Sequence, residues 1–123
     1  MKKFIALIAV SLAFSGPALA HGGAKAKHGG VVRSAGDLSF ELVGKDGKAV
    51  IYVDDHGAAL PTTGASGTLT VLSGGKKSEA VLMPMGTNAM TSKTGVTLVR
   101  GAKAVASITL PGKEAISVRF SYK

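Results

Sequence analysis

The sequence LSFELVGKDGKAVIYV, at residues 38–53, has the pattern of a β-hairpin. In its first half, leucine and phenylalanine alternate with serine and glutamate, which is the period of a strand that buries one face. The turn sequence GKDG follows at residues 44–47, and its Asp-Gly step tolerates the positive φ that a tight hairpin needs. The partner segment, residues 49–53, is apolar on both faces, so we expect it to lie in the middle of a sheet.

The same alternation continues along the chain between glycine-rich turns. Its clearest instance is ISVRFSYK at residues 116–123. Other segments predicted as strands are residues 31–33, 68–72, 79–83, 96–99 and 103–110, whereas residues 87–93 are ambiguous. This spacing predicts an all-β domain: an antiparallel immunoglobulin-like β-sandwich of about seven or eight short strands, with a small β-barrel as the alternative.

Residues 1–20 have the layout of a cleavable signal peptide. A basic start, MKKF, leads into an apolar run at residues 4–14, which is shorter than the roughly 20 residues needed to span a bilayer. The triplet Ala18-Leu19-Ala20 is a pattern that signal peptidase accepts, so we expect cleavage after Ala20 and export to the periplasm. No stable membrane insertion is expected once the signal is removed.

The rest of the chain divides into a tail and a domain. Residues 21–30, HGGAKAKHGG, hold no apolar side chain larger than alanine and are predicted to be a flexible N-terminal tail. Residues 31–123 form the predicted β-sandwich domain. The formal charge of +8 falls by two with Lys2 and Lys3, to +6. Because the basic residues are scattered and the protein is predicted to be exported, we interpret them as a solubilising surface and expect no nucleic-acid partner.

The composition argues against an enzyme. The chain has no cysteine, which excludes disulfides, thiolate metal sites and cysteine catalysis, and it has only seven carboxylate side chains. It lacks the G-x-S-x-G elbow, the phosphate-binding glycine loop and the H-E-x-x-H motif. Since no activated nucleophile with an oriented base can be assembled, we predict a binding protein without catalytic residues.

The three histidines, each followed by glycine, are the candidate metal ligands. His21 would become the N-terminal residue and would offer its amine and its imidazole to one ion. His28 lies in the same tail, and His56 follows Asp54 and Asp55, which add oxygen donors. This donor set suits Cu, Zn, Ni or Co, with Cu favoured by intrinsic affinity. The alternative is that the tail histidines are solvated and that residues 54–57 are an ordinary turn.

Methionines form a weaker candidate set at Met83, Met85 and Met90. Thioether sulfur is a soft donor that selects Cu(I). The alternation that places Val81 and Met83 on one face favours instead a core position for Met83, with the other two filling gaps.

Three short motifs carry a family resemblance: HGGVV at residues 28–32, FELV at residues 40–43 and YVDDHG at residues 52–57. Over roughly residues 28–72 the chain resembles small periplasmic β-sandwich proteins and domains associated with bacterial heavy-metal efflux systems, including accessory domains of efflux adaptor subunits. The resemblance implies that the histidines within these motifs bind the exported metal and that the partner is an efflux component.

The resemblance has limits. The chain has no coiled-coil hairpin or lipoyl-like segment, so it is not a whole adaptor. His21 and the methionines lie outside the matching pattern. A looser similarity links the chain to periplasmic copper-binding sandwiches that use an N-terminal histidine, but their Asp-x-His strand has no counterpart in residues 114–123.

Together these patterns predict a periplasmic protein that binds a divalent transition-metal ion, as a chaperone or buffer linked to metal efflux or resistance. The alternative is an envelope module that binds a protein partner and no ligand. The sequence alone leaves open the metal, the strand order, the oligomeric state, the partner and whether the three histidines converge.

Overall fold

A computed structural model describes residues 25–123, and these form an all-β domain. Its strands are β1 (Val31–Ala35), β2 (Leu38–Lys45), β3 (Lys48–Asp55), β4 (Ala58–Ala59), β5 (Ser66–Ser73), β6 (Lys76–Met85), β7 (Ala89–Ser92), β8 (Lys103–Thr109) and β9 (Ile116–Ser121). In this part of the chain no helix is long and apolar enough to cross a membrane. The predicted signal peptide and His21 lie outside the described residues.

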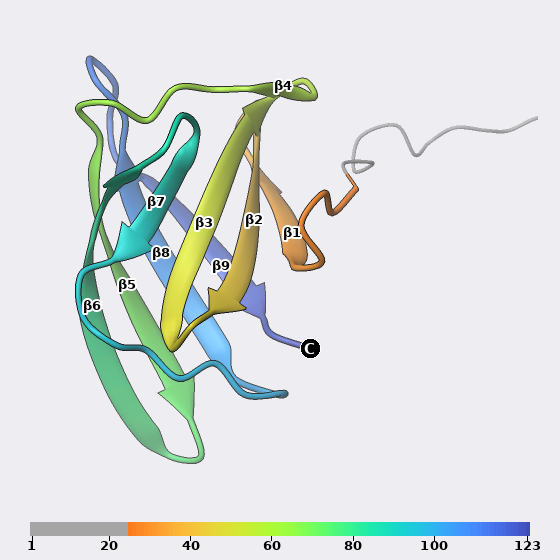
Figure 1. The fold of residues 1–123 in the computed structure, drawn as a ribbon, viewed down its shortest axis with the longest axis vertical. Helices are drawn as coiled ribbons and strands as arrows, with labels where there is room; N and C mark the ends of the chain where they lie inside the picture. Colours follow the sequence, from red (N-terminus) through yellow and green to blue (C-terminus); the bar gives the residue numbers. More distant parts are fainter. Residues whose placement is uncertain (1–24) are drawn as a thin grey trace, which may run out of the picture.

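All strands belong to one antiparallel sheet, which confirms the predicted fold class. The order is β1-β2-β3-β7-β6-β5-β8-β9, and the short β4 pairs with β3. The two ends of this order, β1 and β9, contact each other, so the sheet curls until it nearly closes (Figure 1). The architecture therefore combines both expected forms: two halves of one sheet face each other as in a sandwich, and they are joined as in a small barrel.

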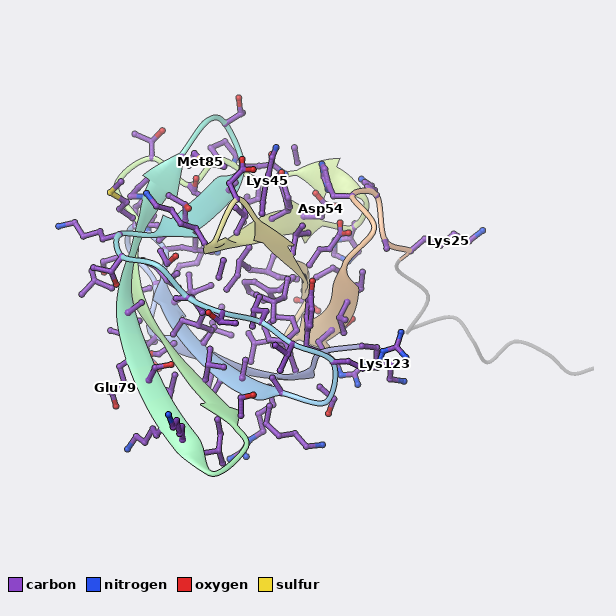
Figure 2. The ribbon with its side chains drawn as sticks, turned by 60° about the horizontal axis from the view of Figure 1, so that its bottom comes forward. Lys25, Lys45, Asp54, Glu79, Met85 and Lys123 are labelled. Carbon is purple, nitrogen blue, oxygen red and sulfur yellow. The ribbon has the colours of Figure 1, made fainter. Side chains whose placement is uncertain are left out.

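Apolar side chains from both halves meet in a single core (Figure 2). The residues that point inward alternate along each strand with residues that point to solvent. The fully buried members with the largest side chains are Phe40, Leu42, Ile51, Leu69, Leu82, Met90 and Ile108. Because Phe40 and Phe120 are the only buried aromatic residues among residues 25–123, most of the core is aliphatic.

The central position expected for residues 49–53 is confirmed, because β3 lies between β2 and β7. Even Val50, on the outer face of β3, is only 3% exposed. The ambiguous residues 87–93 contain β7, whose four residues are all buried.

The strand expected at residues 96–99 is absent. The segment joins β7 to β8, and both of these strands already have two neighbours: β7 pairs with β3 and β6, and β8 pairs with β5 and β9. Val96 instead donates its backbone N–H to the carbonyl of Gly47 at 2.9 Å and buries its side chain against the core. The segment is thus a loop fixed to the β2–β3 turn.

Two tight turns of similar form lie at the two ends of β3. The β2–β3 turn is the predicted hairpin, with Asp46 at φ 52° and Gly47 at φ 77°. The β3–β4 turn has the same form, because Asp55 pairs with Ala58 and the residues between them have positive φ. Turns of this kind follow the natural twist of the flanking strands, and the second one carries a candidate ligand.

Candidate functional site

A buried carboxylate on the outer face of β2 organises the site. Glu41 lies between Val32 of β1 and Tyr52 of β3, where strand alternation predicts a solvated side chain, yet it is only 5% exposed. Residues 27–30 cover it. The carboxylate accepts hydrogen bonds from the backbone N–H groups of Lys27 at 3.0 Å, His28 at 2.8 Å and Gly30 at 2.8 Å, and from Nδ1 of His28 at 3.0 Å. We call this arrangement the Glu41 clasp.

The clasp keeps Glu41 ionised. Burial raises the pKa of the Glu41 carboxyl, but the hydrogen bonds from the His28 side chain and from three backbone amides outweigh burial and bring the pKa below its ordinary value. An ionised carboxylate only accepts hydrogen bonds, so Nδ1 of His28 carries the hydrogen. In the neutral ring the lone pair then lies on the other nitrogen, Nε2, and no hydrogen bond from residues 25–123 reaches it.

Stacking fixes the plane of the His28 ring. It lies parallel to the ring of Tyr52, with centroids 3.5 Å apart and an angle of 4° between the planes. The His28 side chain is still 38% exposed. Glu41 and Tyr52 therefore hold one edge and one face of the imidazole, while part of the ring remains open to solvent.

The glycines after His28 permit this close approach. A Cβ at Gly30 would overlap the carbonyl oxygen of Leu42 and would lie 2.7 Å from Cγ2 of Val43, and Gly29 has φ 76°. The HGG sequence, noted as a candidate ligand motif, thus also has a structural role: glycine alone lets this backbone lie on β2.

Lys27 connects the clasp to the β3–β4 turn. Its Nζ lies 2.9 Å from Oδ2 of Asp54 and 2.9 Å from the carbonyl oxygen of Gly57. Asp54 also lies 3.4 Å from Nδ2 of Asn88. In Figure 2 the segment that contains Lys25 passes beside Asp54. The residues described from the predicted tail therefore lie against the loop that contains the second histidine.

His56 repeats the pairing seen at His28. Its Nδ1 lies 2.6 Å from Oδ1 of Asp55, and both side chains are exposed, at 78% and 45%. His56 has φ 53° and Gly57 has φ 87°, so the histidine occupies a left-handed position where asparagine or glycine is usual. No hydrogen bond from residues 25–123 reaches Nε2 of His56 either.

The structure brings some predicted site residues together and separates others. His28 lies next in sequence to Lys27, whose Nζ contacts Asp54 and the carbonyl oxygen of Gly57, in the segment that contains Asp55 and His56. Within residues 25–123, however, no three His, Cys, Asp or Glu side chains are placed to hold a metal ion together. Glu41 was not predicted as a site residue; the only sequence signal was a carboxylate in an alternating strand downstream of His-Gly-Gly.

The methionines do not form one cluster. Met83 and Met85 point outward from β6, at 39% and 37% exposure, while Met90 is fully buried. The expectation that Met83 occupies the core is wrong. Alternation does place Val81 and Met83 on one face, but Ala80 and Leu82 fill the core, so that face is the outer one.

Compared with protein-family models, curated proteins and solved structures, the chain matches none.

Proposed function

We propose that this protein binds a divalent transition-metal ion, copper or zinc, with Nε2 of His28 and Nε2 of His56 among the ligands. One observation carries the proposal: in both described histidines Nδ1 is paired with a carboxylate, Glu41 at 3.0 Å and Asp55 at 2.6 Å. We further propose that the protein works in the periplasm as a chaperone or buffer that serves a metal-efflux or resistance system.

The carboxylate pairs have a recognised role in metal sites. A carboxylate on one ring nitrogen fixes the tautomer, orients the ring and makes the other nitrogen a better donor. Asp55 would thus orient a ligand, and Asp54 is engaged by Lys27. Two imidazoles leave coordination positions for water or for His21, whose amine and imidazole would complete or compete for the site.

His56 occupies a left-handed backbone position that the β3–β4 turn requires. A non-glycine residue held there costs on the order of 1 kcal/mol, and Asp46 takes the same position in the β2–β3 turn. What supports a ligand role for His56 is therefore its exposed imidazole and its pairing with Asp55.

His28 has a competing explanation. Its contacts with Glu41 and Tyr52 would hold the N-terminal segment in place without any metal. The test must therefore remove Nε2 and keep the clasp. His28→Asn does this, because the asparagine amide nitrogen takes the place of Nδ1 as a donor to Glu41, while the Nε2 position is lost. His56→Asn is the matching change in the turn.

The experiment is isothermal titration with Cu(II) and with Zn(II) of the protein in the form that the expressing cell leaves it. Intact mass first shows whether this form begins at His21. We expect one saturable site that is lost in the His28→Asn/His56→Asn variant, while exchange of the Gly30 amide stays slow. Binding should also weaken below about pH 6, because protons compete for imidazole nitrogen. Absence of saturable binding, or unchanged binding in the double variant, would refute the proposal.

A second candidate function, a ligand-free interaction module, is favoured by a different observation. Val81, Met83 and Met85 form an exposed apolar row on the outer face of β6, and exposed apolar patches often mark protein contacts. Partner binding that is lost in Met83→Ser/Met85→Ser and is indifferent to a chelator would support this function over metal binding.

A further inference from the structure

We propose that the outer face of β5, β8 and β9 carries a binding site for a single-chain anionic amphiphile, a molecule with one charged headgroup and one apolar chain. A hollow of about 500 Å³ lies there. Its lining includes the charged residues Arg33, Lys77, Lys103 and Arg119 and the aliphatic residues Leu72 and Val105. These strands belong to the other half of the sheet from the Glu41 clasp, and β8 and β9 pass behind β2 and β3 in Figure 1.

Strand register places the apolar and cationic side chains together. Leu72 pairs with Lys103, and Val105 pairs with Arg119. Lys77 faces Leu72 across the β5–β6 hairpin. Leu72 is 49% exposed, so the hollow presents an aliphatic floor surrounded by long cationic side chains.

Three of the four cations that line this hollow have no carboxylate partner among residues 25–123. Among residues 25–123, no carboxylate lies within salt-bridge distance of Arg33, Lys103 or Arg119. Lys103 contacts only the neutral hydroxyl of Ser121, at 3.1 Å. Lys77 has Glu79 at 3.7 Å, but both side chains are 64% exposed, and such surface pairs contribute little. The cations therefore repel one another, and a bound anion would relieve that repulsion.

The shape and chemistry select the ligand class. Arginine and lysine bind phosphate, sulfate or carboxylate headgroups through charge-assisted hydrogen bonds. The aliphatic floor adds a favourable contact for a hydrocarbon chain, worth about 25 cal/mol per Å² removed from water. A hollow of this volume suits one small molecule, since ligand pockets span about 300–1,000 Å³. Because the hollow is concave, we favour a monomeric amphiphile over the surface of a bilayer.

The test is titration of the purified protein with decyl phosphate below its micelle concentration, followed by backbone amide shifts. Parallel titrations use inorganic phosphate, neutral decyl maltoside and vesicles of phosphatidylglycerol. The groove variant is Lys103→Gln/Arg119→Gln. The control variant, Lys48→Gln/Lys113→Gln, removes the same charge from exposed positions elsewhere.

We expect one-to-one binding of decyl phosphate with shifts confined to β5, β8, β9 and the lining residues Arg33 and Lys77. Affinity should fall about tenfold in the groove variant and less than about twofold in the control. Leu72→Ser should weaken decyl phosphate and leave inorganic phosphate unchanged. Equal weakening in both charge variants would refute the site as an effect of net charge. If decyl maltoside binds as tightly as decyl phosphate, the cations have no role in binding. If inorganic phosphate binds as tightly, the apolar floor has none. Binding of the vesicles alone would refute a site for a monomeric amphiphile and would indicate a membrane surface.

Discussion

Replacing Glu41 with glutamine should release the N-terminal segment while the barrel stays folded. Glutamine has nearly the same shape, but one carboxylate oxygen becomes an NH₂ group. In the native protein Oε1 accepts from Lys27 N and His28 Nδ1, and Oε2 accepts from His28 N and Gly30 N. The amide can accept at one position only. At least one backbone N–H therefore loses its acceptor and faces the NH₂ group, whereas Nδ1 of His28 can accept from that group after a change of tautomer. The remaining hydrogen bonds lose the negative charge of their acceptor.

The expected loss follows from these contacts. Hydrogen bonds to a charged group contribute about 1.5–3 kcal/mol each, so losing one backbone bond, together with the charge that strengthens the other bonds, weakens attachment of residues 27–30 by about 3 kcal/mol. Detachment lets water satisfy the freed amides, and this limits the loss in global stability to about 1–2 kcal/mol. The clasp should therefore open far more often than the barrel unfolds.

Native-state hydrogen exchange measures this difference directly, because the Gly30 amide donates to Glu41. A loss of about 3 kcal/mol corresponds to a drop of roughly 100-fold in its protection factor. Amides of the β5–β8 pair should change only with global stability. Glu79→Gln is the matched control, since Glu79 is 64% exposed and has one weak partner. Unchanged protection of Gly30 in Glu41→Gln, or an equal change in Glu79→Gln, would refute the clasp.

Three further predictions concern stability in urea. Burial raises the pKa of Glu41, but the His28 and backbone hydrogen bonds hold that pKa below the ordinary value of 4.5. The ionised Glu41 carboxylate therefore contributes its full stabilisation above about pH 4.5. This stabilisation is lost as the pH falls through the pKa of Glu41 in the folded state. The difference between wild type and Glu41→Gln should accordingly be constant from about pH 5 to 8 and shrink in acid. Gly30→Ala should cost about 2 kcal/mol because its Cβ overlaps the β2 backbone, whereas Gly95→Ala, whose Cβ would meet only Gly47 O at 3.5 Å, should cost less than about 1 kcal/mol; equal effects would contradict the steric argument. Phe40→Ala should cost about 3–5 kcal/mol, and a loss below about 1 kcal/mol would show that Phe40 is not in the core.

Local pattern was enough to predict the hairpins but not how they assemble. The β2–β3 hairpin follows from alternation and an Asp-Gly turn, both of which lie within a few residues of each other. β7 is different, because its residues pair with Val50–Tyr52 and with Leu82–Met85, and nothing within residues 89–92 encodes those partners. The same reason explains the error at residues 96–99: strand propensity was present, but β7 and β8, which flank the segment, each already pair with two other strands.

Only those parts of the candidate site that depend on the type of side chain could be predicted from the sequence. His28 and His56 stood out by their residue type and their glycine neighbours. The role of Glu41 depends mainly on backbone amides, which every residue except proline possesses and which leave no mark in a sequence. The direction of the methionine face likewise depended on which side of β6 the curled sheet encloses.

The position of β7 has a consequence for how fast this chain folds. Each half of the sheet consists mainly of hairpins between neighbouring segments, and β7 joins β3 to β6 through four residues. The β3–β7 pairing closes a long loop, from Ile51 to Met90, before its contacts can compensate the lost chain entropy. Folding dominated by such distant pairs takes milliseconds to seconds. We therefore expect residues 89–92 to be ordered late, so substitutions in β7 should mainly accelerate unfolding, whereas substitutions in the β2–β3 hairpin should slow folding.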